Sequence, residues 1–250
     1  MTRRILLIGD PHAHPRYDND RFETIGAFAR QREVDRVHCV GDWTDYPSLN
    51  LHKSMLDARQ GNYEDDVEAG NDALLRFDEG LDGHPCIKTI TLGNHDEYPE
   101  QYVAKVDPTL AGTVRWDRVR FRDHGWRVTR FKDTTAVAGL RASHYFSRRG
   151  TGRAIAGQHQ AHAINGTTDQ STVVGHAHVF DHKIKTFESG RSIHSFVAGC
   201  NVHPKYREGW CADTVQYWHR GLLLVTMGRG PSVESFEWVT LEAVTKEVGR

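Results

Sequence analysis

The sequence predicts an α/β fold in which two β-sheets pack face to face and helices cover their outer sides. Two observations support this prediction. In the first half, short apolar runs closed by glycine alternate with stretches that suit helices, an order typical of parallel strands joined by crossover helices. In the second half, strand-like pieces follow one another across short turns, which indicates hairpins and a second, mixed sheet. No repeat or low-complexity tract divides the chain, so we expect a single domain over residues 1–250.

Three buried parallel strands are expected in the first half. Each is rich in β-branched side chains and ends in a glycine followed by polar residues, at residues 5–9 (ILLIG), 34–41 (VDRVHCVG) and 86–93 (CIKTITLG). The segment 21–32 suits a helix because its apolar residues recur on one face. A longer helical region is expected over residues 49–81, although Gly61 and Gly70 weaken its continuity.

The second half is expected to form mixed strands and one helix. Its strand-like pieces, joined by Gly, Asn or Asp turns, are residues 118–131, 134–144, 171–180, 182–197 and 217–227. The helix is expected at residues 152–164. The apolar C-terminal piece, residues 221–244, could finish the second sheet or form a dimer surface, and the sequence does not separate these alternatives.

The composition describes an ordinary globule with no general attraction to polyanions. The chain has 32 Lys and Arg against 33 Asp and Glu, so no net field would hold it on nucleic acid or an anionic membrane. Its four cysteines form no CxxC pair, which favours a reducing, intracellular setting. The N-terminal apolar run is too short for a signal sequence or a membrane span. We therefore expect a cytoplasmic protein with no membrane partner.

Polar side chains with metal-binding chemistry follow the expected strands. In chain order they are Asp10, His12, Asp42, Asp45, Asn94, His95, Asp96, His144, His176 and His178. Because the carboxyl ends of parallel strands share one edge of a sheet, residues far apart in the sequence would converge there. Singly, such an Asp or Asn is as well explained by a turn or a helix cap. Together they indicate a metal site.

The number of donors favours two ions. Two carboxylates, one amide oxygen and four imidazoles are too many for a single tetrahedral zinc, and a carboxylate such as Asp42 can bridge a pair of ions. Two cations roughly 3.5 to 4 Å apart can hold a hydroxide and stabilise both oxygens of an in-line displacement at phosphorus. The mixed nitrogen and oxygen set suits divalent or mixed-valence transition metals, above all manganese or iron, with zinc or nickel as alternatives. The chemistry predicted is phosphoester hydrolysis.

Five short blocks carry a resemblance to a known family. DPH (10–12), GDWTD (41–45), GNHD (93–96), His144 and GHAH (175–178) resemble the ordered motifs of the calcineurin-like metallophosphoesterase superfamily. The resemblance implies a four-layer αββα sandwich of two mixed sheets between helices. It also implies ligands for two metals: Asp10, His12 and His178 for one, Asn94, His144 and His176 for the other, and Asp42 for both.

His95 is the candidate catalytic residue. Placed next to a ligand and facing the substrate, its imidazole could bind the phosphoryl oxygen and protonate the departing alkoxide. Asp45 or Asp96 could hold that imidazole through its other ring nitrogen and favour its charged form. In family members the second Asp of GDxxD usually supports this histidine, so we favour Asp45.

Four further residues are candidates for substrate contacts. Arg148 and Arg149 lie just after His144, either in a solvated loop or as a clamp for phosphate, whose oxygens match a guanidinium fork. His14 competes with His12 in the HAH segment; the family pattern favours His12 as ligand and leaves His14 a possible substrate-facing role. Tyr145 could stack on a base or pack in the core.

The leading hypothesis is a phosphodiesterase acting on nucleotides or cyclic nucleotides, by attack of a metal-bridging hydroxide. The alternative is a nuclease on DNA or RNA. A phosphoprotein phosphatase is disfavoured, because family members of that type carry Arg-Gly after GDxxD and Glu after GNH, where this chain has Tyr46-Pro47 and Asp96. A non-catalytic metal-binding scaffold would be expected to have lost a ligand or His95. The native substrate, the metals and the oligomeric state stay open at this point.

Overall fold

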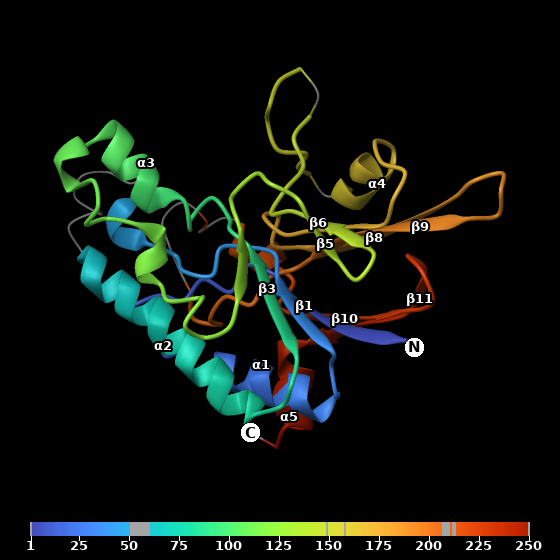
Figure 1. Ribbon diagram of the computed structural model, residues 1–250, viewed down its shortest axis with the longest axis horizontal. Coiled ribbons are helices and arrows are strands. Elements are labelled where there is room, and N and C mark those ends of the chain that lie inside the picture. Colours follow the sequence, from blue (N-terminus) through green and yellow to red (C-terminus); the bar gives the residue numbers. More distant parts are fainter. Residues whose placement is uncertain are drawn as a thin grey trace.

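The structure, a computed structural model, describes residues 2–50, 61–148, 150–157, 159–206, 211 and 214–249. The strands are β1 (Arg3–Ile8), β2 (Arg36–Cys39), β3 (Ile87–Thr91), β4 (Arg127–Thr129), β5 (Thr135–Val137), β6 (Leu140–Ala142), β7 (Thr172–Val174), β8 (Phe180–Thr186), β9 (Ser192–Ala198), β10 (Gly221–Met227) and β11 (Val233–Thr240). The α-helices are α1 (Asp20–Gln31), α2 (Tyr63–Leu81), α3 (Tyr98–Lys105), α4 (Gln160–Asn165) and α5 (Leu241–Glu247). Figure 1 shows their arrangement.

The strands form two mixed sheets, which confirms the predicted fold class. The first sheet has six strands in the order β11-β10-β1-β2-β3-β4, of which β1 to β4 are parallel and β10 and β11 antiparallel. The second has five in the order β5-β6-β7-β9-β8, parallel from β6 through β7 to β9 and antiparallel at both edges. Each parallel run ends in loops at one edge of its sheet.

Strand β1 shows how the layers are stacked. Leu6 and Ile8 belong to an apolar cluster with Phe22 of α1 and Phe77 of α2. Ile5 and Leu7 belong to another cluster that includes residues of β7 and β9. Because successive side chains of a strand point to opposite faces, β1 is buried by helices on one side and by the second sheet on the other. Helix α4 packs against β8 and β9 on the far side of the second sheet, which completes four layers.

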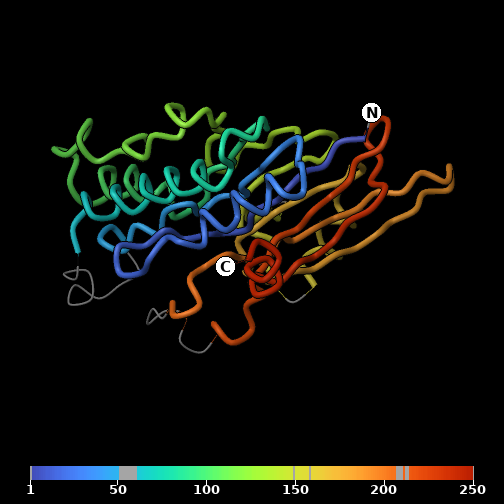
Figure 2. Tube along the Cα trace, turned by 90° about the horizontal axis from the view of Figure 1, so that it is seen from below, coloured from blue at the N-terminus to red at the C-terminus, as the bar shows by residue number. Residues whose placement is uncertain are grey.

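Two glycines allow the helices over the first sheet to approach closely. A Cβ atom on Gly26 of α1 would lie 2.2 Å from the carbonyl oxygen of Phe77, and one on Gly80 of α2 would lie 2.0 Å from that of Glu23. Helix α2 begins where the Asn62 side chain accepts the backbone N–H of Asp65, a standard N-cap. Figures 1 and 2 show α1 and α2 side by side.

Several expected element boundaries were wrong. In the segment 118–131, expected to be a strand, only Arg127–Thr129 is a strand, and the first residue of the segment ends a 3-10 helix at Trp116–Arg118. The helix expected at residues 152–164 is confined to Gln160–Asn165, because the chain before it pairs Ser147 with Ala154 in a small hairpin. The expected strands 134–144 and 182–197 are each a hairpin of two strands.

The helical region expected from residue 49 begins at Tyr63; residues 51–60 lie outside the described part of the chain. The C-terminal piece does not finish the second sheet. Its strand β10 pairs with β1, and β11 pairs with β10, so the piece completes the first sheet, followed by α5. Hydrophobicity alone did not reveal this, because both sheets need an apolar strand.

The helices of the described chain give no membrane-spanning candidate, since none is both long and apolar enough. The four cysteines Cys39, Cys86, Cys200 and Cys211 are free thiols.

Candidate metal centre

Loops from both sheets meet at one place and carry the predicted ligands. The loops that follow β1, β2, β3, β6 and β7 bring together Asp10, His12, Asp42, Asn94, His144, His176 and His178. Both predicted carboxylates and His144 are fully or almost fully buried. The convergence expected at the carboxyl ends of the strands is therefore present in the structure.

One group of donor atoms surrounds the side chain of Asn94. Its Oδ1 lies 2.9 Å from Nε2 of His144 and 2.9 Å from Nδ1 of His176, and those two nitrogens are 3.2 Å apart. Oδ2 of Asp42 is 3.4 Å from Nε2 of His144. The other nitrogen of His144, Nδ1, lies 2.9 Å from the carbonyl oxygen of Val40. A proton on Nδ1 would bond that carbonyl and leave Nε2 free to bind a metal.

The second group of donor atoms lies on the other side of Asp42. Its Oδ2 is 3.7 Å from Nε2 of His12, and His12, Asp42 and His178 together form a group that could hold an ion. Asp10 joins this group, since its Oδ2 lies 3.5 Å from Nε2 of His178. Asp42 thus contributes to both groups, the position that a bridging carboxylate requires.

Two buried atoms in this centre test whether a metal fits. Oδ1 of Asp10 and Nε2 of His12 make no hydrogen bond to any residue that the structure describes. A buried polar atom without a partner costs roughly 1–3 kcal/mol, so such atoms need an explanation. Both face the other donors, and a cation held there would satisfy them. The residues present therefore fit a metal pair.

The backbone of the centre is strained in a way that suits a functional site. Five of the seven candidate ligands have positive φ: Asp10, His12, Asp42, His176 and His178, with values of 29°, 46°, 52°, 70° and 57°. Non-glycine residues seldom adopt this region, and the strain persists only where the surroundings enforce it. It aims each side chain from a sharp turn into the centre.

The glycines of the motifs leave room for ligands on neighbouring loops. A Cβ atom on Gly93 would lie 2.0 Å from Oδ1 of Asp42, and one on Gly175 would lie 2.4 Å from Oδ1 of Asp10. Any larger residue would displace these carboxylates. At Gly93 and Gly175 the glycine before the polar cluster is explained by this close approach.

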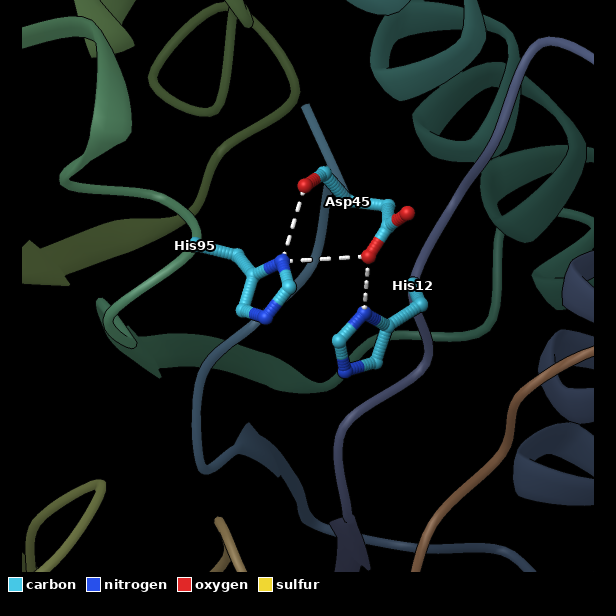
Figure 3. A group of neighbouring side chains, drawn as sticks. All are labelled: His12, Asp45 and His95. Carbon is cyan, nitrogen blue, oxygen red and sulfur yellow. Dashed lines mark hydrogen bonds and ion pairs between the residues drawn. The ribbon is translucent and has the colours of Figure 1, made fainter. Parts of the chain in front are cut away.

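Asp45 connects two imidazoles of the centre (Figure 3). Its Oδ1 lies 2.6 Å from Nδ1 of His12 and 3.0 Å from Nδ1 of His95, and its carbonyl oxygen lies 2.8 Å from the same atom of His95. The Tyr206 hydroxyl lies 3.2 and 3.1 Å from the two carboxylate oxygens. The alternative support, Asp96, instead accepts the backbone N–H groups of Gly93 and the loop after β2.

The charges of the centre favour a protonated His95 beside neutral ligands. Burial lowers the pKa of His95, but Asp42 and Asp45 outweigh it and raise the pKa to about 9. Burial lowers the pKa of His176 to about 4 and also lowers the pKa of His144 and His178. Imidazoles must be neutral to bind a metal, so His144, His176 and His178 are in the required form near pH 7.

Burial and the neighbouring Asp42 raise the pKa of Asp10 well above its ordinary value. For Asp42, burial acts in the same direction but is outweighed by His144, His95 and His12, so its pKa is lowered. Two buried carboxylates therefore compete for negative charge in this centre. A cation between them would relieve that competition.

A cavity of about 290 Å³ opens onto the centre. His95 lines it together with Asp42, Asn94, His176 and His178. Two aromatic residues form further walls: Tyr98 packs on His95 at 4.6 Å between ring centroids, and Trp218 packs edge-on against His178 at 4.2 Å. The cavity gives a phosphoester access to the donor atoms and to His95.

The four residues predicted to contact substrate do not lie together at the first cavity. His14 is buried against Tyr17 and Tyr206 and is not among the residues that line this cavity. Tyr145 lies between the centre and a second cavity, which Arg148 also lines. Arg149 lies outside the described residues.

Three supporting residues were not found from the sequence. The buried guanidinium of Arg21 donates to the carbonyl oxygens of Pro11, His12 and Asn201 at 2.8, 3.0 and 2.9 Å, and so fixes the first ligand loop. Tyr206 and Trp218 act on Asp45 and His178 from a distant part of the chain. None stands in a motif, and only tertiary structure places them here.

The sequence of the chain matches the model of a known family. The family described as calcineurin-like phosphoesterase matches residues 3–180. No curated protein matches the sequence. Among solved structures, one match is a conserved uncharacterized protein from Streptococcus pneumoniae that is described as a predicted phosphoesterase. It shares 10% identity, with 97% of this chain and 91% of that chain covered and a TM-score of 0.38.

Proposed function

Since the chain belongs to the calcineurin-like phosphoesterase family and is thus a metal-dependent phosphoric ester hydrolase, we propose that it is a phosphodiesterase for nucleotide-like substrates. The observation that supports this most is the double role of Asp42, whose carboxylate belongs to both groups of donor atoms. We also propose that residues 1–250 form one domain. The free thiols suit a reducing, cytoplasmic setting.

Two metal ions would be held by the seven residues of the centre. Asp10, His12 and His178 would hold one, Asn94, His144 and His176 the other, and Asp42 both. When bound, the metals would supply an activated water and neutralise charge on the phosphoryl oxygens. The nitrogen-rich donor set favours manganese or iron, with zinc or nickel as alternatives.

His95 would act on the leaving group. Its Nδ1 is held by the carbonyl and carboxylate oxygens of Asp45, so we assign proton transfer to its Nε2, which lies 3.5 Å from the hydroxyl of Tyr98, a residue that lines the same cavity. As oxygen from water adds to phosphorus, the ester P–O bond breaks and the departing alkoxide takes the proton from Nε2. The raised pKa of His95 keeps that proton in place near neutral pH.

The walls of the cavity support a diester with a flat group. Tyr98 and Trp218 offer ring faces and edges on which a base or another aromatic group could pack. A nuclease acting on DNA or RNA is the second candidate. The cavity beside Tyr145, which Lys132, Arg141 and Arg148 also line, favours a nuclease over an enzyme for cyclic nucleotides.

The test is hydrolysis of bis-p-nitrophenyl phosphate and of p-nitrophenyl phosphate by metal-stripped protein refilled with Mn²⁺, Fe²⁺, Zn²⁺ or Ni²⁺. We expect metal-dependent turnover, fastest with the diester. Preference for the monoester would overturn the phosphodiesterase proposal, and no turnover with any of these metals would overturn hydrolysis of simple esters altogether.

A further inference from the structure

A second cavity, larger than the first, lies beside the metal centre. It has a volume of about 590 Å³, and its lining includes Lys132, Arg141, Arg148, Phe146, Ile155 and Ile164. Three cations thus line the same cavity as an apolar wall, and no acidic residue stands among the described residues of the lining. We refer to it as the cationic cavity. A cavity of this size and character suits an anionic group attached to an apolar or flat one.

The three cations have no acidic partner within the described part of the chain. Among the residues that the structure describes, no carboxylate forms an ion pair with Lys132, Arg141 or Arg148. By contrast, Arg118 is paired with Glu64 and Lys88 with Asp78. Arg141 is instead held over the ring of Phe146, 4.8 Å from its centroid. Three unpaired cations around one space attract an anion such as phosphate.

The cationic cavity is joined to the metal centre through one aromatic residue. Tyr145 lines the cavity and packs against His176, with 5.1 Å between ring centroids. Strand β6 supplies Arg141 to the cavity and leads directly to His144 in the centre. Lys132 follows Phe131, whose ring lies 6.2 Å from that of His144. A ligand in the cavity would therefore lie next to a substrate at the metals.

The loop after β6 forms a small hairpin that carries residues of the cavity lining. Two backbone hydrogen bonds join its two arms. The N–H of Arg148 donates to the carbonyl oxygen of Arg153 at 2.8 Å, and the N–H of Ile155 donates to that of Phe146 at 2.8 Å. Figure 1 shows the loop beside α4, and Ala163 and Ile164 of this helix also line the cavity. These bonds fix the backbone that carries Phe146 and Arg148, both of which line the cavity.

We propose that the cationic cavity binds a second phosphate of the substrate, carried on the same nucleoside as the diester that is cleaved. This inference rests on the proposed phosphodiesterase function and narrows its substrate class. The cations would bind the second phosphate, and the apolar wall of Phe146, Ile155 and Ile164 would pack against the nucleoside. Cyclic mononucleotides carry a single phosphate, so the preferred substrates are nucleotides with a further phosphate, or strands.

Two pairs of esters test the proposal. One pair is the 5′-p-nitrophenyl phosphate of thymidine with and without a 3′-phosphate; the other is the 3′-p-nitrophenyl phosphate of thymidine with and without a 5′-phosphate. Within a pair only the second phosphate differs. In at least one pair we expect it to raise kcat/KM about tenfold or more, the range of hydrogen bonds to charged groups.

The measured ratio is kcat/KM with the second phosphate divided by kcat/KM without it. The variant Lys132→Ala/Arg148→Ala should lower this ratio to near one. The control Arg122→Ala/Arg191→Ala removes two exposed positive charges elsewhere and should keep the ratio. The restoring variant Lys132→Arg/Arg148→Lys should recover most of it. A ratio near one in both pairs for the unmodified protein would overturn the second-phosphate site while leaving the phosphodiesterase intact. Absence of turnover with all four esters would overturn both proposals.

Competition identifies the source of the second phosphate. Thymidine 3′,5′-bisphosphate and the phosphorylated tetranucleotide d(pTpTpTpT) would each inhibit hydrolysis of bis-p-nitrophenyl phosphate. Stronger inhibition by the tetranucleotide would point to a nucleic-acid strand, and equal inhibition to a small nucleotide. Inhibition by thymidine 5′-monophosphate as strong as that by the bisphosphate would contradict the site.

Discussion

Asp45 holds the imidazole of His95 through two oxygens at once: its carbonyl oxygen lies 2.8 Å and its carboxylate Oδ1 3.0 Å from Nδ1 of that ring. The same carboxylate oxygen lies 2.6 Å from Nδ1 of His12, a candidate metal ligand. One residue therefore orients both the proposed proton donor and part of the metal centre.

Replacing His95 with alanine should affect esters according to their leaving group. Without the proton donor, turnover of a diester with an alkyl leaving group should fall roughly 10²- to 10⁴-fold. The loss should be much smaller for bis-p-nitrophenyl phosphate, because p-nitrophenolate departs without a proton. Steady-state rates with both substrates check this. The exposed His162→Ala is the control, and equal losses with both esters would contradict a proton-donor role.

The pH dependence should reflect the protonation of His95. Asp42 and Asp45 outweigh the effect of burial and raise its pKa to about 9, so the donor form is present below that pH and is lost as pH rises through it. The alkaline limb of the kcat profile reflects this loss. Bound metal cations would repel the proton on His95 and so move that limb to lower pH. Asp45→Asn removes one of the charges that raise the pKa and should shift the alkaline limb of kcat to lower pH. An unshifted limb would show that another group titrates.

Arg21 should be more important for metal binding than its position outside the motifs suggests. Its guanidinium satisfies the buried carbonyls of Pro11 and His12, so Arg21→Met should cost about 2–4 kcal/mol in the free energy of unfolding. It should also weaken Mn²⁺ binding roughly 10- to 100-fold, as changes around metal ligands do. Urea unfolding and calorimetric titration measure both. Arg30→Met, on the same helix, removes only an exposed ion pair with Asp82 and should cost less than about 1 kcal/mol. Similar costs for the two variants would contradict the role of Arg21 in holding the loop of Pro11 and His12.

A single methyl group on Gly93 should disturb the shared carboxylate. The added Cβ would lie 2.0 Å from Oδ1 of Asp42, so Gly93→Ala must displace that side chain or its loop. We expect loss of at least one bound metal, measured by elemental analysis. The matched change Gly61→Ala meets no atom within 4 Å and should keep the metal content. Full metal content in Gly93→Ala would contradict the placement of Asp42.

The sequence predicted the sheets and the convergence of polar residues, because both follow from local pattern and general topology. Glycine-closed apolar runs located β1, β2 and β3, and their shared edge placed Asp10, Asp42 and Asn94 together. The place of the C-terminal strands could not be predicted. β10 lies beside β1 although almost the whole chain separates them, and such pairing leaves no local signal.

The supporting residues were beyond sequence reasoning for a related reason. Tyr206 lies 161 positions from Asp45, and Arg21 reaches Asn201 across 180 positions. A tyrosine in a loop and an arginine in an amphipathic helix are ordinary in sequence, and only their burial against polar partners marks them. The lining of the cationic cavity was anticipated in part, since Arg148 and Tyr145 were candidates for substrate contacts, whereas Lys132, which lies between β4 and β5, was not among them.

The most direct test of the account is whether Asp42 bridges two metals. Protein refilled with Mn²⁺ and freed of excess metal should contain two ions per chain, and its electron paramagnetic resonance spectrum should show the many-line pattern of an exchange-coupled Mn²⁺ pair. Asp42→Ala should abolish the coupling and release at least one ion. One ion per chain in the unmodified protein, or two with uncoupled spectra, would contradict the dinuclear centre proposed here.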